Sequence, residues 1–270
     1  MKATVLVDNI PHGDLQAEWG LSVFIEYNEK NILLDFGSTE LMFENAKALG
    51  IDIKSADMAV LSHSHFDHSG GIARFFEENQ KATLFVKSLC ENCHAKKPFK
   101  KKRYNGVPKG VLSRNKNRVE VVSGKTEIAK GIYLLDHSEK NLYKKGKKSH
   151  LYREENGRLV PDDFSHEQSL IFETENGLVI FNSCCHSGAD LVIKEAQKAF
   201  PNKKIKALIG GFHLFDRPKR DVIKLAQNIK ATGIEFICTG HCTGEKAYNI
   251  LKENLGDMCR HFHTGLILEF

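Results

Sequence analysis

Short hydrophobic runs alternate with amphipathic stretches along the first third of the chain, a pattern typical of a mixed α/β fold. The polar residues 28–30 interrupt one hydrophobic run and predict a β-hairpin. Gly50 follows a stretch with apolar residues at helical spacing and predicts the end of a helix. We expect strands over residues 3–7, 21–27, 31–36, 57–62 and 82–86, and helices over residues 39–49 and 69–78.

The second half of the chain repeats this alternation. Glu175-Asn176-Gly177 separates two apolar runs and predicts another hairpin. Two polar segments, residues 94–118 and 138–163, show little regular period, and we expect the first to be a long loop that lines or covers a site. We expect strands over residues 119–122, 132–135, 168–173, 178–182, 205–209, 236–239 and 264–269, and helices over residues 189–200, 219–232 and 245–255.

Histidines recur where predicted strands end. A strand, a glycine or serine, a histidine and a helix follow one another at His63, His186, His213 and His241. In α/β proteins the functional groups collect outside the carboxyl ends of the strands. The four positions are therefore expected to converge on one site.

The sequence SHSHFDHSGG at residues 62–71 carries the most specific chemical signal. It places His63, His65, Asp67 and His68 within six residues, between a buried strand and a helix. Imidazole nitrogens and carboxylate oxygens are the usual ligands of zinc and also suit iron and manganese. Packing alone does not account for so many histidines in one turn, so we expect a metal site.

These residues resemble the defining motif of the metallo-β-lactamase superfamily. His63, His65, Asp67 and His68 match its His-x-His-x-Asp-His pattern, and Asp35, after the first hairpin, matches an aspartate that supports the metal loop. The resemblance implies one domain over residues 1–270 with a four-layer αββα sandwich. It also implies two metal ions at one edge, between the sheets.

Three further segments resemble a narrower branch, the dihydropterin-ribofuranosylaminobenzene phosphate synthase-like proteins, which are metal-dependent hydrolases. These segments are Pro161–Gln168, Gly210–Leu214 and Thr239–Gly244. A branch label alone does not identify the substrate.

The resemblance also implies a ligand set. One metal would be held by His63, His65 and His186, and the other by Asp67, His68 and His241. The family usually supplies a bridging aspartate, but here the corresponding turn holds Cys184 and Cys185, and Cys185 is a possible substitute ligand. We expect Asp67 to act on the nucleophilic water as well, His213 to be a ligand or an acid that faces the substrate, and Asp35 to orient the imidazoles.

Charge adds a candidate substrate site. The net charge is +5, yet residues 94–118 hold ten basic residues and no acidic one. This segment is either a solvated basic loop insertion or a binding surface for an anion. In the second case Lys100, Lys101, Lys102 and Arg103 would bind a phosphate group.

The predicted function is a metal-dependent hydrolase with two divalent ions, zinc first and iron or manganese as alternatives. A metal-bound hydroxide would attack a phosphorylated or anionic small molecule such as a phosphoester, a cyclic phosphodiester or a pterin precursor. Two alternatives stay open: a nuclease of the same fold, which would bind nucleic acid, and a non-catalytic metal-binding or sensing protein.

The remaining features set broader expectations. No apolar run approaches the roughly 20 residues that span a bilayer, and the N-terminus reaches Asp8 too soon for a secretory signal, so we expect a cytoplasmic protein with reduced thiols. Cys90-x-x-Cys93 resembles half of a zinc or haem motif without its partner. His12, His150, His166 and His261 lie in polar stretches and are expected at the surface. Nothing in the sequence indicates the oligomeric state.

Overall fold

Two seven-stranded sheets form the centre of the protein, for which a computed structural model describes residues 1–87 and 91–270. The first sheet mixes antiparallel and parallel pairs and has the order β18-β1-β2-β3-β4-β5-β8. Its strands are β1 (Lys2–Val7), β2 (Ser22–Tyr27), β3 (Lys30–Leu34), β4 (Met58–Val60), β5 (Thr83–Val86), β8 (Val119–Val121) and β18 (Ile267–Glu269). Asn28 and Glu29 both have positive φ angles, 46° and 60°, which gives the β2–β3 hairpin the twist of a two-residue turn.

The second sheet has the order β17-β16-β15-β14-β13-β10-β9. Its strands are β9 (Lys125–Ala129), β10 (Ile132–Asp136), β13 (Gln168–Thr174), β14 (Gly177–Phe181), β15 (Ile205–Gly211), β16 (Phe236–Gly240) and β17 (Cys259–His261). Strands β14 to β17 run parallel to one another, so the carboxyl ends of β14, β15 and β16 meet at one edge of the sheet.

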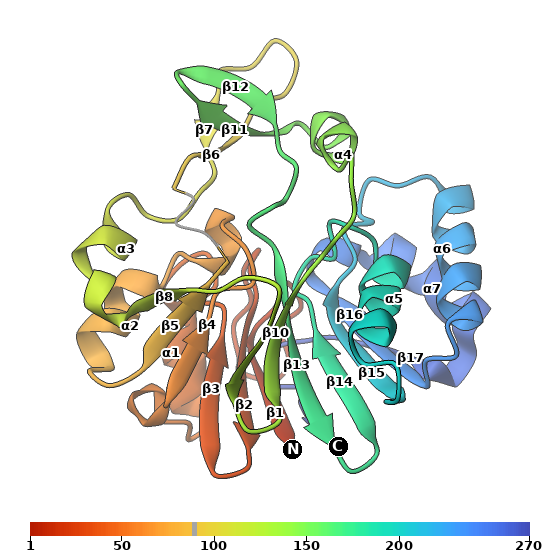
Figure 1. Ribbon diagram of the computed structural model, residues 1–270, viewed down its shortest axis with the longest axis horizontal. Coiled ribbons are helices and arrows are strands. Elements are labelled where there is room, and N and C mark those ends of the chain that lie inside the picture. Colours follow the sequence, from red (N-terminus) through yellow and green to blue (C-terminus); the bar gives the residue numbers. More distant parts are fainter. Residues whose placement is uncertain (88–90) are drawn as a thin grey trace.

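Helices cover the outer face of each sheet (Figure 1). The first sheet carries α1 (Leu41–Ala48), α2 (Ile72–Glu78) and α3 (Val111–Arg114), and the second carries α5 (Ala189–Ala199), α6 (Lys219–Ala231) and α7 (Glu245–Leu255). Five short 3₁₀ turns are η1 (Ile53–Ser55), η2 (Phe66–His68), η3 (Lys116–Arg118), η4 (His241–Thr243) and η5 (Gly256–Met258). The expected four-layer αββα sandwich is confirmed.

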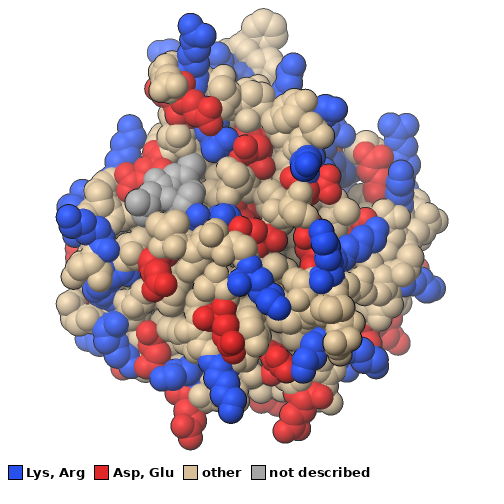
Figure 2. Space-filling model, in the orientation of Figure 1, with Lys and Arg blue, Asp and Glu red and all other residues tan. Residues whose placement is uncertain are grey.

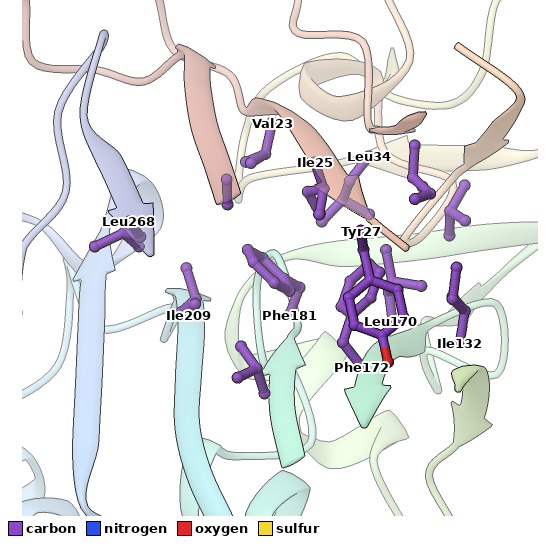
Figure 3. Close-up of a cluster of buried hydrophobic side chains, with 14 of the residues drawn as sticks. Val23, Ile25, Tyr27, Leu34, Ile132, Leu170, Phe172, Phe181, Ile209 and Leu268 are labelled. Carbon is purple, nitrogen blue, oxygen red and sulfur yellow. The ribbon is translucent and has the colours of Figure 1, made fainter. Parts of the chain in front are cut away.

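The main hydrophobic core lies between the two sheets (Figure 3). Val23, Ile25 and Leu34 of the first sheet face Phe172 and Phe181 of the second. Two further clusters fill the space between each sheet and its helices. This packing fixes the edge at which the strand ends of both sheets come together.

A third, four-stranded sheet stands above the sandwich and corrects two expectations (Figure 1). It consists of β6 (Cys93–Ala95), β7 (Arg103–Tyr104), β11 (Leu151–Glu155) and β12 (Arg158–Pro161), and α4 (Tyr143–Lys148) precedes β11. The expectation of a long structureless loop over residues 94–118 is therefore wrong in part, and so is that of an irregular segment over 138–163. Strand β6 pairs with β11, which is more than 50 residues away in the sequence. Because the pairing is not local, the sequence around β6 does not show the hydrophobic alternation that would have predicted a strand.

The local pattern missed two other strands. Strands β9 and β17 are short, partly exposed edge strands of the second sheet, so they lack the apolar run that marked their neighbours. None of the helices in the described part of the chain combines the length and the apolar character needed to cross a membrane.

Candidate metal centre

The candidate site lies where strands from both sheets end. His63, His65 and His68 follow β4 in the first sheet, whereas His186 and His241 follow β14 and β16 in the second. The glycines after the histidine motif have a steric reason, because a Cβ added at Gly70 would lie 1.9 Å from the Ser38 carbonyl oxygen. This close approach packs the metal-motif turn against the loop after β3.

Three imidazoles form the first half of the site. One nitrogen each of His63, His65 and His186 lies within 4.8 Å of the others, and all three side chains are buried. Burial and the neighbouring imidazoles lower the pKa values of His63 and His186 well below the usual range, so both rings are neutral. Their Nε2 atoms have no hydrogen-bond partner within residues 1–87 and 91–270. Neutral, buried and unpartnered nitrogens are suited to a metal ion.

The second half of the site surrounds Asp67. Its Oδ2 lies 3.5 Å from Nε2 of His241 and 3.9 Å from Nε2 of His68, and it accepts a 2.9 Å hydrogen bond from the Trp19 indole. Burial alone would raise the pKa of Asp67, but the two imidazoles hold it far below its usual value. Burial lowers the pKa of His241, whereas Cys242, Asp67 and Asp8 raise it, to about 9.

Cys184 lies between the two halves. Its Sγ is 3.3 Å from Nε2 of His68, and it is within 4.8 Å of ligand atoms of His63 and, in a separate group, of His186. The expectation that Cys185 faces the metals is corrected, because its Sγ lies 3.6 Å from the Asn182 carbonyl oxygen and its side chain packs in the core under α5. Burial and the neighbouring Cys242 raise the pKa of Cys184, so its sulfur would take the place of the absent bridging aspartate only when a metal ion displaces the thiol proton.

Oxygen acceptors on the outer side of the site fix the ring orientations. Oδ2 of Asp35 lies 2.7 Å from Nδ1 of His68, and Oδ1 of Asn9 lies 3.1 Å from Nδ1 of His241. The Ser62 hydroxyl donates to Asp35 at 2.6 Å and lies 2.9 Å from Nδ1 of His63. In each case the oxygen acceptor holds a hydrogen on Nδ1, so Nε2 is the nitrogen that would bind an ion.

The ring of His65 is oriented through Nε2 instead of Nδ1. Its Nε2 lies 3.4 Å from Oδ2 of Asp162, a fully buried carboxylate that also lies 3.1 Å from Nε2 of His166. Donation from Nε2 of His65 directs its lone pair to Nδ1. Asp162 is thus a positioning residue for this ligand, and the surface location expected for His166 is wrong, because that side chain is only 1% exposed.

His65, Cys93, Asp162 and His166 also gather ligand atoms within 4.8 Å. Nδ1 of His166 accepts a hydrogen bond from the backbone N–H of Ser64, at 3.1 Å. In the neutral ring the proton must then sit on Nε2, which donates to Asp162 and has no lone pair for an ion. We therefore interpret this group as a hydrogen-bond network. Cys90, the other half of the Cys-x-x-Cys motif, lies outside the described residues.

His213 faces the site from the end of β15. Neither of its ring nitrogens has a hydrogen-bond partner among the described residues, and its ring centroid is 4.6 Å from that of His186. Its φ angle is 48°, and Asp35, Cys185 and His241 also have positive φ values of 45–58°. Such left-handed backbone is strained for non-glycine residues and tends to concentrate at functional sites.

The predicted phosphate-binding cations lie apart from the site cavity. Lys100, Lys101 and Lys102 are exposed, and Lys102 pairs with Glu154. The Arg103 guanidinium lies 5.4 Å from the ring centroid of Phe66, a residue within the metal motif. None of the four lines the cavity of about 370 Å³ that His186 and His213 border, so their role in substrate binding stays a prediction.

Several site residues had only weak sequence signals. Cys184 adjoins His186, yet a cysteine pair does not reveal which member points inward. Asp162 and His166 are four residues apart, and this spacing was the available hint of a shared network. Asn9 reaches His241 from the opposite end of the chain, so no local pattern could have found it.

The fold and the histidine cluster define the class: the chain belongs to the metallo-β-lactamase superfamily, a family of metal-dependent hydrolases. The family model for the metallo-beta-lactamase superfamily matches residues 20–142. Within the family, the chain is 33% identical over 272 residues to the 7,8-dihydropterin-6-methyl-4-(beta-D-ribofuranosyl)-aminobenzene-5'-phosphate synthase of Methanocaldococcus jannaschii. This similarity covers 94% of the present chain and 90% of the synthase.

Solved structures agree with this assignment. The metal-dependent hydrolase Tm1679 of the beta-lactamase superfamily superimposes with a TM-score of 0.86 at 30% identity, covering 100% of this chain and 99% of that one. Zinc-bound PqqB from Methylobacterium extorquens gives a TM-score of 0.58 at 11% identity over 100% of both chains, which shows the shared fold alone. The fold implies divalent-metal binding, and the clusters described above supply candidate ligands.

Proposed function

We propose that the protein is a metal-dependent hydrolase with a two-metal centre that acts on a small anionic molecule. The observation that carries the proposal is that the buried Nε2 atoms of His63 and His186 have no hydrogen-bond partner in the part of the chain that the structure describes. Leaving polar atoms without partners in a protein interior is costly, and bound metal ions remove that cost.

The ligands divide naturally between two ions. His63, His65 and His186 would hold one, and Asp67, His68 and His241 the other. Cys184 lies beside ligands of both. A thiolate among imidazoles favours zinc, while iron and manganese remain compatible with the nitrogen and oxygen donors. When bound, two such ions supply a water of lowered pKa as nucleophile and polarise a phosphoryl or carbonyl oxygen.

The protein's own residues hold and complete this centre. Asp35, Asn9 and Asp162 fix the imidazole tautomers from outside. Trp19 orients the Asp67 carboxylate, which is positioned to accept a proton from the nucleophilic water. His213 has free ring nitrogens toward the cavity and can donate a proton to the leaving group.

A small substrate fits the surface better than a nucleic acid does. The cavity of about 370 Å³ has the size of a small-molecule site. On the face seen in Figure 2, basic and acidic side chains are interspersed, and they form no continuous basic track over the described residues there. A nucleic acid would call for such a track.

The similarity to a synthase supports a second candidate reaction. That relative is named for a product with a pterin, an aminobenzene riboside and a phosphate. In a synthase reaction at the same centre, an acceptor other than water would attack the activated group. Product analysis with and without a candidate acceptor separates the two reactions.

The direct test is His65→Ala, with His150→Ala as a matched control outside the candidate site. We expect His65→Ala to lose metal and the hydrolysis of generic phosphodiester, phosphomonoester and lactone substrates together, and the control to retain both. A metal-free variant that still hydrolyses the substrate would refute the proposal.

A further inference from the structure

A cavity with basic walls opens onto the candidate metal centre. Its volume is about 370 Å³, and His186 and His213 form its inner end. Helix α4 contributes Lys144, Lys145 and Lys148 to the wall, and the segment before α6 contributes Arg217. Lys144 and Lys145 belong to a basic cluster at residues 140–148 that the sequence already shows as a candidate anion-binding segment, whereas Arg217 lies outside it.

The acidic side chains in this wall already have partners. Asp190 accepts a 2.9 Å hydrogen bond from Asn228 and lies 3.9 Å from Lys194. Asp221 lies 4.0 Å from the Lys148 ammonium group. The wall as a whole has four basic and two acidic side chains, so a positive charge remains for an incoming anion.

Lys145 and Arg217 lie deepest among the basic groups. The ammonium group of Lys145 donates to the Ser187 carbonyl oxygen and forms no ion pair with any described residue. Burial lowers its pKa, because the ammonium group has lost water without gaining a carboxylate in contact. The Arg217 side chain is 14% exposed; its guanidinium donates to the Ser149 hydroxyl at 3.1 Å, and its Nε lies 3.5 Å from Oδ1 of Asp216, a half-exposed carboxylate.

Apolar side chains form the rest of the wall. The ring of Phe164 stacks on His186 with centroids 4.1 Å apart and an angle of 4° between the planes. Phe212, Leu214 and Leu225 also line the cavity. Because Phe164 and Phe212 are almost fully buried, the accessible apolar surface comes from the leucines, and together with the basic groups it matches a molecule with an apolar body and an anionic end.

We propose that this cavity binds the phosphate group of an organic phosphate monoester through Lys145 and Arg217, with the apolar body of the substrate against Leu214 and Leu225. The inference rests on the proposed function, because it names the class of substrate that the metal centre would act on. It also replaces Lys100–Arg103 as the expected phosphate site.

The test measures binding of inorganic phosphate and phenyl phosphate to the metal-loaded protein by titration calorimetry at constant ionic strength. The variants are Lys145→Met and Arg217→Gln, and Lys224→Gln on the exposed side of α6 is the matched control. Lys101→Gln tests the alternative basic segment. Thermal unfolding of each variant identifies any that fails to fold.

We expect the dissociation constant of both ligands to rise about tenfold or more in Lys145→Met and in Arg217→Gln, as for the loss of one charged hydrogen bond. Lys224→Gln and Lys101→Gln should bind as the wild type does. Unchanged binding in both cavity variants, or a loss in Lys101→Gln alone, would overturn the inference. Either of the two cavity variants is sufficient if the other does not fold.

The binding experiment and a hydrolysis assay together distinguish failure of this inference from failure of the proposed function. If the cavity variants lose phosphate binding but the wild type hydrolyses no substrate, the phosphate site stands and the hydrolase proposal fails. If hydrolysis depends on metal but the cavity variants bind phosphate normally, the hydrolase proposal stands and this inference fails.

Discussion

Asp35→Asn should preserve the packing of the residue that supports the metal loop while removing its negative charge and one hydrogen-bond acceptor. Asp35 is fully buried, and its Oδ1 accepts a hydrogen bond from the backbone N–H of Ser62 at 2.7 Å. Its Oδ2 accepts from the Ser62 hydroxyl at 2.6 Å and lies 2.7 Å from Nδ1 of His68. Asparagine has nearly the same shape and tolerates the φ angle of 58° found here.

The expected magnitudes follow from the hydrogen-bond count. In either orientation of the new amide, its NH₂ group faces a buried N–H group of Ser62 or His68. One buried donor then loses its acceptor, at a cost of about 1–3 kcal/mol in the free energy of unfolding. Where the NH₂ group faces His68, the ring no longer holds its proton on Nδ1, and loss of such an outer partner weakens metal binding by about 10–100-fold.

The assay is zinc titration of chelator-stripped protein by calorimetry, with urea unfolding in parallel. Asp52→Asn is the matched control, since Asp52 is an exposed carboxylate that accepts the Lys54 backbone N–H at 3.0 Å and lies outside the candidate site. The reasoning is refuted if Asp35→Asn binds zinc within twofold of wild type and of the control.

Three further predictions address the second metal, the core and an ion pair. Cys184→Ser should lower metal content toward one ion per chain, whereas Cys185→Ser should leave it unchanged; equal effects in metal analysis would contradict the assignment. Phe172→Ala should reduce the free energy of unfolding in urea by about 3–5 kcal/mol, because this fully buried ring packs between the sheets, and a loss below about 1 kcal/mol would contradict that packing. Burial raises the pKa of Asp57, but the 2.7 Å contact with Lys81 lowers it to a net value below 3.8. The pair therefore stabilises the fold above that pH and loses its effect as the pH falls through the lowered pKa. Unfolding of Asp57→Asn and wild type should differ by less than about 1 kcal/mol at pH 7 and converge in acid, and a difference that grows in acid would contradict the sign.

Most of the sandwich could be predicted because its strands carry their own signal. The runs that became β3, β4, β14 and β15 are buried and apolar, and they are bounded by turns or glycines. The small upper sheet could not be predicted in this way. Its strands are polar and short, and they pair across long sequence separations, so only the folded chain reveals them.

For the candidate site too, the residues in local motifs could be predicted and those that depend on long-range contacts could not. Residues 63–68 form a local motif, and the strand-end histidines His186, His213 and His241 share one position in the fold, so sequence alone could group them. Which cysteine points inward depends on the backbone of the turn after β14, where Cys185 has a φ of 45°, and local sequence does not specify that conformation. The basic cavity wall arises from α4 folding against the end of β14, a contact that local sequence does not encode.

The central claim is that two metal ions share this centre, and metal content per chain tests it most directly. Plasma mass spectrometry should be applied to protein purified without chelator or affinity tag, for the wild type and His241→Ala. The account predicts about two ions per chain in the wild type and about one in the variant. A single ion in the wild type, unchanged by His241→Ala, would contradict it.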